Sequence, residues 1–480
     1  MDNHDEIFVG GKRRHSSSNG NISVVNPATE AVIGHIPDSN EADVSVAVDA
    51  AHEALDRGDW SRLSPRERAH YLRALAGIIE RERETIAAVV TQQNGVAIGN
   101  SLASVDKAVA SYRYYAVLAD DLELEEIRPT QENHAIVRYE PVGVAGLIIP
   151  WNGPQPLLAW KLAPALVAGC TVVVKPAPET TLDSYLLVEA CDEAGFPPGV
   201  VNLVPGGRDT GAALVRNVRT NKIAFTGSTA AGQAIGEICG FQLKPATLEL
   251  GGKSAAIVMD DVDMTTFAPH VASVCSPNTG QVCRACTRIL VPRNRYEEAV
   301  DVVAMAMSAV RVGDPMDPTT QFGPLVSGRQ RERVEGYIKR GLEEGATLVT
   351  GGGRPPDLPV GYYVEPTVFR DVTNDMTIAQ EEIFGPVLVV IPYDSVDEAI
   401  SIANDSKYGL GGFVFTADIE RGTDVARRLQ TGSVGVNHHV MAIESPFGGY
   451  KMSGIGREMG PEGIFTYMQI KSMYLPGEVK

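Results

Sequence analysis

Positive charge, cysteine and long apolar runs are all scarce in this chain of 480 residues. Lysine and arginine number 42 against 60 aspartates and glutamates, which gives a formal net charge of −18. An acidic average surface repels phosphate backbones and anionic lipids, so it argues against nucleic acids and membranes as partners. The longest strongly apolar stretch, residues 142–151, is interrupted by glycine and proline and falls far short of the roughly 20 residues that cross a bilayer.

Only six cysteines occur, too few for a disulfide scaffold in so long a chain. Thiols in a reducing compartment are the better interpretation, and the polar, acidic N-terminus has no signal-peptide pattern, so we expect a cytoplasmic protein. Cys283 and Cys286 form a Cys-x-x-Cys pair, but no second pair has the spacing of a zinc site, and we predict no metal. One redox role stays open, in which Cys286 traps Cys283 as a disulfide under oxidation.

The pattern of apolar residues predicts an α/β fold. Residues 40–119 carry apolar side chains at three- and four-residue spacing, which indicates helices. From residue 141 onward, short apolar strands alternate with helices, the pattern of a parallel, doubly wound sheet. A second α/β series begins near residue 288, and two sheet systems in one chain predict a ligand cleft between them.

Two segments, residues 122–140 and 464–475, do not fit this plan. Both mix apolar and polar residues in partial alternation and predict exposed strands. Because an exposed strand edge is a liability unless it is paired, both segments are candidate contacts between subunits.

Residues 278–286 form the most conspicuous motif. They make a glycine-containing loop that leads into a predicted strand, a setting that suits an exposed nucleophile at Cys283. A buried structural cysteine is the alternative, because free cysteine is among the most buried residue types. The motif by itself does not separate the two.

Glu249 lies between apolar residues at a predicted strand end and is followed by two glycines. We expect it to be buried or to lie at the mouth of the cleft, where its pKa rises and the carboxylate can act as a general base. A carboxylate held in a salt bridge is the alternative interpretation.

Three further strand ends carry polar groups. Residues 225–232 follow a strand and open a helix, whose N–H groups can hold a phosphate, although an ordinary turn explains them equally simply. Lys175 closes an apolar strand and brings its ammonium to the edge where doubly wound folds bind nucleotides; a surface lysine is the alternative. Asn152, after Trp151, offers an amide donor for an oxyanion, or else it only shapes the turn.

Taken together, these stretches resemble the aldehyde dehydrogenase superfamily over essentially the whole chain. Each motif is weak singly, but their order along the chain is specific. The motifs lie at residues 150–152, 175–177, 225–228, 249–253, 280–283, 381–386 and 446–451.

The resemblance implies a fold of three parts: a doubly wound nicotinamide-binding domain, a second α/β catalytic domain and a small bridging β element. The bridging element joins subunits into homodimers or homotetramers. Carried over, the three parts are residues 1–121 with 141–250, residues 251–449, and residues 122–140 with 464–480.

The resemblance also implies a mechanism for oxidising an aldehyde to a carboxylate. Cys283 attacks the aldehyde, and the Asn152 amide and the Cys283 N–H hold the oxyanion of the thiohemiacetal. Hydride then passes to the nicotinamide, which leaves a thioester, and Glu249 activates the water that hydrolyses it.

A cofactor site follows from the same resemblance. Lys175 is expected to bond the adenosine ribose, Ser228 the pyrophosphate and Glu382 the nicotinamide ribose. The other residues expected to contact the cofactor are Ile148, Pro150, Trp151, Pro178, Glu179, Gly227, Leu250, Gly251 and Phe384.

Two departures from the family pattern bear on specificity. Pro178 stands where many NAD-using members carry a glutamate, so NADP is possible, while the neighbouring Glu179 favours NAD, our narrow preference. Gly153 replaces a frequent aromatic residue after Asn152, which predicts a wide tunnel and a bulky, mainly apolar aldehyde. The other expected tunnel walls are Leu157, Trp160, Val282, Arg284 and Phe447, of which we expect Arg284 to be solvated.

Three other functions stay open. A CoA-acylating aldehyde dehydrogenase is the first, although Glu249 argues against it because that branch generally lacks the deacylating acid. A non-catalytic protein that keeps the fold is the second. A redox-responsive protein governed by Cys283 and Cys286 is the third.

Overall fold

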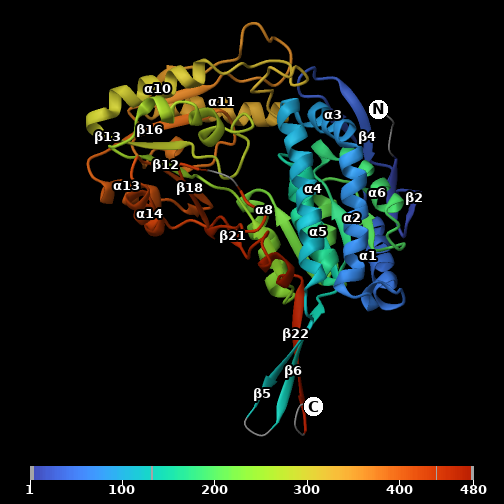
Figure 1. Cartoon of the computed structure of the whole chain (residues 1–480). Coiled ribbons are helices and arrows are strands. Elements are labelled where there is room, and N and C mark those ends of the chain that lie inside the picture. Colours follow the sequence, from blue (N-terminus) through green and yellow to red (C-terminus); the bar gives the residue numbers. More distant parts are fainter. Residues whose placement is uncertain (1–4, 131–132, 439–440, 477–480) are drawn as a thin grey trace.

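Two lobes stand side by side, and a narrow three-stranded sheet projects from them in this computed structural model (Figure 1). The structure describes residues 5–130, 133–438 and 441–476. The predicted domain ranges also include residues 1–4, 131–132, 439–440 and 477–480, which lie outside the described residues.

The N-terminal part supplies four short strands and then four helices, as the periodicity of residues 40–119 predicts. Ser64 caps the second helix by accepting a hydrogen bond from the Glu67 N–H, with Pro65 in its first turn. The elements are β1 (Glu6–Val9), β2 (Lys12–His15), β3 (Asn21–Val25), β4 (Val32–Pro37), α1 (Glu41–Asp56), α2 (Pro65–Arg81), α3 (Arg83–Asn94) and α4 (Ile98–Asp120).

The first lobe is built on a sheet in the order β2-β1-β9-β8-β7-β10-β11-β21. Its central strands, β9, β8, β7, β10 and β11, are parallel to one another. Alternate residues of one strand face two different cores: Ala145 and Leu147 pack on one side, Val144 and Ile148 on the other. This confirms the doubly wound prediction. The further strands are β7 (Val144–Ile148), β8 (Thr171–Lys175), β9 (Val201–Leu203), β10 (Lys222–Thr226), β11 (Ala246–Glu249) and β21 (Gly454–Ile455), and the further helices are α5 (Pro154–Ala168), α6 (Leu182–Glu193), α7 (Arg208–Arg216) and α8 (Thr229–Phe241).

The second lobe has its own sheet, in the order β14-β15-β16-β13-β12-β18-β19, and its own core. All neighbouring strands are parallel except β14, which is antiparallel to β15. Its strands are β12 (Ala255–Val258), β13 (Arg288–Pro292), β14 (Thr347–Thr350), β15 (Thr367–Arg370), β16 (Val387–Tyr393), β18 (Gly411–Phe415) and β19 (Ser433–Val436). Its helices are α9 (Met264–Phe267), α10 (Tyr296–Ser308), α11 (Gly328–Glu343), α12 (Thr377–Gln380), α13 (Val396–Asn404) and α14 (Ile419–Arg428).

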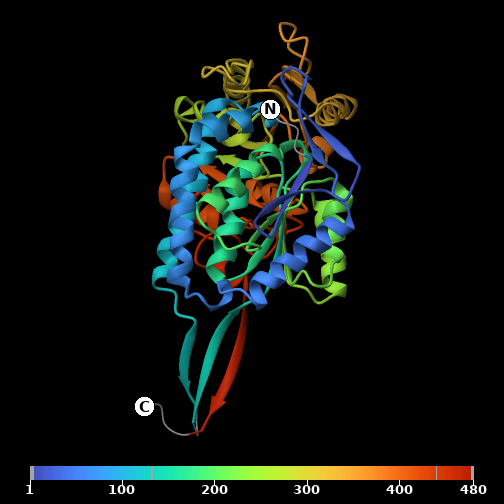
Figure 2. The ribbon, with the colours of Figure 1, turned by 90° about the vertical axis from the view of Figure 1, so that its right-hand side faces the viewer.

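The projecting sheet joins the two segments that did not fit the α/β plan. β22 (Met468–Leu475) pairs with β6 (His134–Pro141), and β6 pairs with β5 (Glu125–Pro129) (Figure 2). The predicted strand over 464–475 is wrong at its start. After Pro461, residues Glu462–Phe465 form the short helix α15, packed through the buried Ile464, and the strand begins only at Met468.

Two strand pairs remain outside these sheets: β3 pairs with β4, and β17 (Tyr408–Gly409) pairs with β20 (Tyr450–Lys451). Among the described helices, none combines the length and the apolar character needed to cross a bilayer.

Candidate active site

Four strand-end residues from the sequence motifs lie at one edge of the first sheet: Ile148, Lys175, Thr226 and Glu249. In the parallel register, Ile148 is opposite Lys175 and Thr226 is opposite Glu249. The carboxyl ends of parallel strands meet at the same edge, so the local pattern of each strand places its last residue there.

The Cys283 loop comes from the second lobe and packs against this edge. Three successive residues before it, Asn278, Thr279 and Gly280, have φ of 51°, 57° and 73°. Gly252, just after β11, lies so close that a Cβ there would collide with the Cys283 carbonyl oxygen. Only glycine permits this approach between the two lobes.

The Asn152 side chain is tied directly to the same loop. Its Nδ2 donates a hydrogen bond to the Gln281 carbonyl at 2.9 Å, and Asn278 Nδ2 donates to the Asn152 carbonyl at 3.3 Å. The amide and the thiol-bearing loop are therefore brought together from two different lobes.

Apolar side chains surround the thiol. Cys283 packs with Trp160 and Phe447, whose ring centroids are 6.3 Å apart. The other members of this cluster are Leu157, Leu410, Met441, Ile443 and Met459. A Cβ on Gly153 would make only ordinary van der Waals contacts, the nearest with Leu157 at 3.5 Å, so the fold tolerates a larger residue at this position.

Burial sets the charge state of the two central groups. Burial, followed by the charges of Glu382 and Glu249, raises the pKa of the Cys283 thiol to about 12. Burial, followed by the charge of Glu458, raises the pKa of Glu249 well above its ordinary value. Within the described part of the chain, neither Glu249 carboxylate oxygen has a hydrogen-bond partner. Burial therefore favours the protonated form of both groups, and each becomes reactive when it loses its proton.

A buried ion pair beside Glu249 was not predicted. Lys161 Nζ lies 2.7 Å from Glu458 Oε1 and donates to Thr226 Oγ1 at 2.8 Å. Lys161 is fully buried and Glu458 is 4% exposed. The only signal was a lone lysine inside the apolar helix α5, and nothing in the sequence identified its partner.

The comparisons with known proteins agree with this geometry. The model of the aldehyde dehydrogenase family matches residues 14–473. The geranial dehydrogenase of Castellaniella defragrans is 48% identical over 99% of both chains. The chain belongs to the aldehyde dehydrogenase family. This confirms the resemblance stated on the sequence motifs.

Solved aldehyde dehydrogenases have the same fold. The Mycobacterium tuberculosis enzyme complexed with NAD⁺ superposes with a TM-score of 0.96, at 46% identity over 99% of both chains. A mutant of aldehyde dehydrogenase C from Pseudomonas syringae, complexed with NAD⁺ and octanal, superposes with a TM-score of 0.95, at 38% identity over 98% of this chain and 96% of that one.

In this family member, the residues expected at the nicotinamide form one group. The rings of Trp151 and Phe384 meet edge to face, with centroids 5.3 Å apart. Phe384 has a φ of 64° and its carbonyl accepts a hydrogen bond from Gln330 at 2.8 Å. Glu382 accepts from the Gly252 N–H at 3.0 Å, and burial raises its pKa to about 7. A Cβ on Gly251 would lie 2.5 Å from the Glu382 carboxylate, so the chain leaves room here for glycine only.

The residues expected at the adenosine end lie at the same sheet edge. Ser228 is exposed at the start of α8 and accepts from the Ala231 N–H at 3.3 Å. Lys175 is buried, which lowers its pKa to about 8. Pro178 begins a single helical turn, and Glu179 lies 3.6 Å from the exposed Arg329. The remaining expected residues end or follow strands at this edge: Ile148, Pro150, Gly227 and Leu250.

Arg284, which was expected to be solvated, is partly buried, and burial lowers the pKa of its guanidinium. Val282, on the other side of the nucleophile, is also partly buried. The other side chains of the apolar cluster around Cys283 were missed because they come from loops that carry no motif: Leu410, Met441, Ile443 and Met459.

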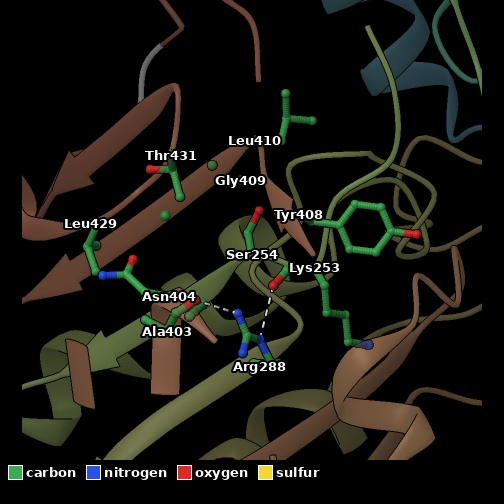
Figure 3. A pocket seen from close by; sticks show the side chains of 13 residues that line it. Lys253, Ser254, Arg288, Ala403, Asn404, Tyr408, Gly409, Leu410, Leu429 and Thr431 are labelled. Carbon is green, nitrogen blue, oxygen red and sulfur yellow. Dashed lines mark hydrogen bonds between the residues drawn. The ribbon is translucent and has the colours of Figure 1, made fainter. Parts of the chain in front are cut away.

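A small cavity lies in the second lobe, and its lining does not include Cys283 (Figure 3). It is lined by Lys253, Ser254 and Arg288, and Arg288 Nε donates to the Lys253 carbonyl at 3.0 Å. The volume open to the centre of a water molecule in this cavity is only about 10 Å³, so the cavity holds about one water molecule.

Proposed function

We propose that the protein oxidises an aldehyde to its carboxylate with NAD as the hydride acceptor. The observation that carries this is the contact between Asn152 and the Cys283 loop, beside the buried Glu249. Cys283 sulfur, once deprotonated, bonds to the carbonyl carbon. The Asn152 amide and the Cys283 N–H then stabilise the negative charge on the carbonyl oxygen.

The second half of the reaction depends on Glu249. NAD, when bound, would supply the hydride acceptor, and loss of hydride from the substrate carbon would leave a thioester on Cys283. Glu249 takes a proton from water, the hydroxyl oxygen bonds to the thioester carbon, and the C–S bond breaks to release the acid. Burial favours the uncharged form of Glu249, and the charge of the adjacent Glu458 adds to this effect.

The residues at the sheet edge fit NAD. The exposed N-terminal N–H groups of α8 suit a pyrophosphate, Lys175 suits ribose hydroxyls, and Glu382 suits the nicotinamide ribose. Solved relatives at 46% and 38% identity are NAD⁺ complexes. Glu179 supports NAD over NADP by repelling a 2′-phosphate, although its pairing with Arg329 weakens that repulsion.

The substrate is a bulky, mainly apolar aldehyde. Gly153 and the apolar cluster around Cys283 leave room for a chain or ring and offer it few polar contacts. The 48% identical relative is named for geranial, and a solved relative holds octanal. The partly buried Arg284 also contributes to this wall.

The test measures formation of reduced nicotinamide by absorbance with geranial, octanal, benzaldehyde and acetaldehyde, each with NAD and NADP. We expect kcat/KM to be highest for the first three aldehydes and for NAD, and Cys283→Ala to lose at least about 10⁴-fold of the activity. Asn152→Ala is expected to lose about 10²- to 10³-fold in kcat. Activity only with added CoA, or full activity of Cys283→Ala, contradicts the proposal.

The protein acts as a homodimer or homotetramer in the cytoplasm. Large apolar side chains stay exposed on the single chain at the end of α8 and on β22: Phe241, Leu243, Ile470 and Tyr474.

The six cysteines are free thiols, as a reducing compartment requires. In this proposal the first sheet binds cofactor (residues 1–121 and 141–250), residues 251–449 carry the nucleophile, and residues 122–140 and 464–480 bridge subunits. Sedimentation velocity tests the assembly, and a monomer contradicts it.

A further inference from the structure

A fully buried carboxylate lies one layer beneath the Asn152 loop. Asp183, in the first turn of α6, is 1% exposed. Its two oxygens accept hydrogen bonds from two buried amides: Gln93 Nε2 at 2.7 Å and Gln155 Nε2 at 2.5 Å. Neither the apolar core nor the reaction assigned above needs a carboxylate here.

The network connects three helix ends. Gln93 belongs to the end of α3, and its Oε1 also accepts from the Leu182 N–H at 2.9 Å. This contact satisfies the start of α6, where Thr181 makes no side-chain cap. Gln155 belongs to the first turn of α5, three residues after Asn152.

A second contact from the same helix end reaches the Asn152 loop. Asn94, which follows Gln93, donates from Nδ2 to the Trp151 carbonyl. The loop that carries Asn152 is thus held on both sides, at Trp151 by Asn94 and at Gln155 by Asp183. A buried network of this kind has one arrangement in which every donor finds an acceptor, so it fixes the geometry of what it holds.

We propose that Asp183 is a positioning residue for the oxyanion site: through Gln155 and Gln93 it fixes the start of α5, and with it the Asn152 amide, at the distance that the reaction requires. The inference rests on the proposed function, in which Asn152 holds the oxyanion. A carboxylate is required because both partners present N–H groups, and only two acceptor oxygens satisfy both. Burial raises the pKa of Asp183 to about 6, so the group is ionised in an assay at pH 8.

The primary test is Asp183→Asn. The introduced amide nitrogen faces one of the two glutamine amides, so one hydrogen bond is lost and two donors oppose each other. We expect kcat to fall roughly 10- to 100-fold, because small misplacements of a catalytic group have effects of that size. The dissociation constant for NAD, measured by calorimetry, is expected to change less than about twofold. The matched control is Asp192→Asn, the same change at an exposed position of the same helix, with kcat unchanged.

A double-mutant cycle distinguishes positioning from a general structural role. In the Asn152→Ala background, Asp183→Asn is expected to cause no further loss of kcat, because the group that it positions is gone. An equal loss in both backgrounds overturns the proposal.

Rescue gives a second, independent readout. In the double variant Asp183→Asn with Gln155→Glu, the introduced amide donates to the introduced carboxylate, and the amide oxygen still accepts from Gln93. We expect this variant to recover most of the lost kcat. If Asp183→Asn does not fold, Gln155→Leu takes its place in the cycle, since it removes one donor and leaves Gln93 on Asp183.

The two levels of the proposal fail in different ways. If Asn152→Ala keeps full kcat while Cys283→Ala is inactive, the oxyanion role fails and this inference fails with it. If Asn152→Ala is slow and both Asp183→Asn and Gln155→Leu keep full kcat, only the positioning role of Asp183 is overturned.

Discussion

The same pairs of residue types occur in two very different places in this molecule. Beside Glu249, Lys161 and Glu458 lie 2.7 Å apart with almost no exposure. On the projecting sheet, Lys471 and Glu140 also lie 2.7 Å apart, with side chains 54% and 32% exposed. Arg138 adds further exposed contacts there, to Glu125 at 2.6 Å and to Glu140 at 3.1 Å.

The comparison shows that burial, and not distance, decides what a charge pair does. Water and salt screen the exposed pairs, so each contributes little to stability. In the buried pair neither charge has water as an alternative partner, so the loss of one leaves the other uncompensated. The same exclusion of water allows Glu458 to raise the pKa of Glu249, while the charges of the projecting sheet do not reach the site.

The largest expected effect comes from breaking the buried pair. Lys161→Met leaves Glu458 unpaired in the interior, and we expect the free energy of unfolding to fall by about 3–5 kcal/mol. Urea unfolding followed by circular dichroism measures it, with Lys471→Met as the matched exposed control. Equal effects of the two variants refute the comparison.

The second effect concerns the ionisation of Cys283. Because its pKa is raised to about 12, its thiolate fraction grows with pH over the whole accessible range. In enzyme without cofactor, the rate of carbamidomethylation by iodoacetamide is expected to rise about tenfold per pH unit from pH 7 to 9. N-acetylcysteine under the same conditions should level off near its own pKa. The other five cysteines are buried, so we expect the label on Cys283, which mass spectrometry checks. A labelling rate that reaches a plateau below pH 8 would contradict the raised pKa of this thiol.

The third effect is a shift in pH dependence. Glu249 acts as a base only above its pKa, so the rate of deacylation rises with pH. Because Glu458 raises the pKa of Glu249, this rise occurs at higher pH than it would without Glu458. Glu458→Gln removes a negative charge, lowers the pKa of Glu249 and moves the acidic limb of the kcat profile to lower pH. Glu140→Gln on the projecting sheet should leave the limb in place. A shift in the opposite direction contradicts the assignment of Glu458 as the charge that raises the pKa of Glu249.

The smallest effect is expected at the exposed pairs. Lys471→Met should change the stability of a single chain by less than about 1 kcal/mol. A larger loss of stability that depends on protein concentration would show that a second subunit buries this sheet, so that the pair is no longer an exposed one.

The local sequence pattern was sufficient to predict most helices and strands and the sheet edge at which the reactive groups lie. Short apolar strands that alternate with helices predicted a sheet covered on both faces. Lys175 and Glu249 were placed correctly at strand ends because a strand delivers its last residue to a defined edge. Family motifs then supplied the expected roles, which the proposed variants test. The helix at Glu462–Phe465 was missed because a segment of only four residues has too few positions to show a helical period.

The sequence by itself determined the α/β class, the family and the strand ends at which the reactive groups stand, because each of these is written in neighbouring residues. Only the tertiary structure decided that Lys161 meets Glu458, that Asp183 holds Gln93 and Gln155, and that Arg284 is partly buried. These contacts join segments far apart in the chain, and their consequences depend on how completely packing excludes water. The local pattern indicated burial at Glu249, but it did not show which charged groups lie close enough to change the pKa values at this site.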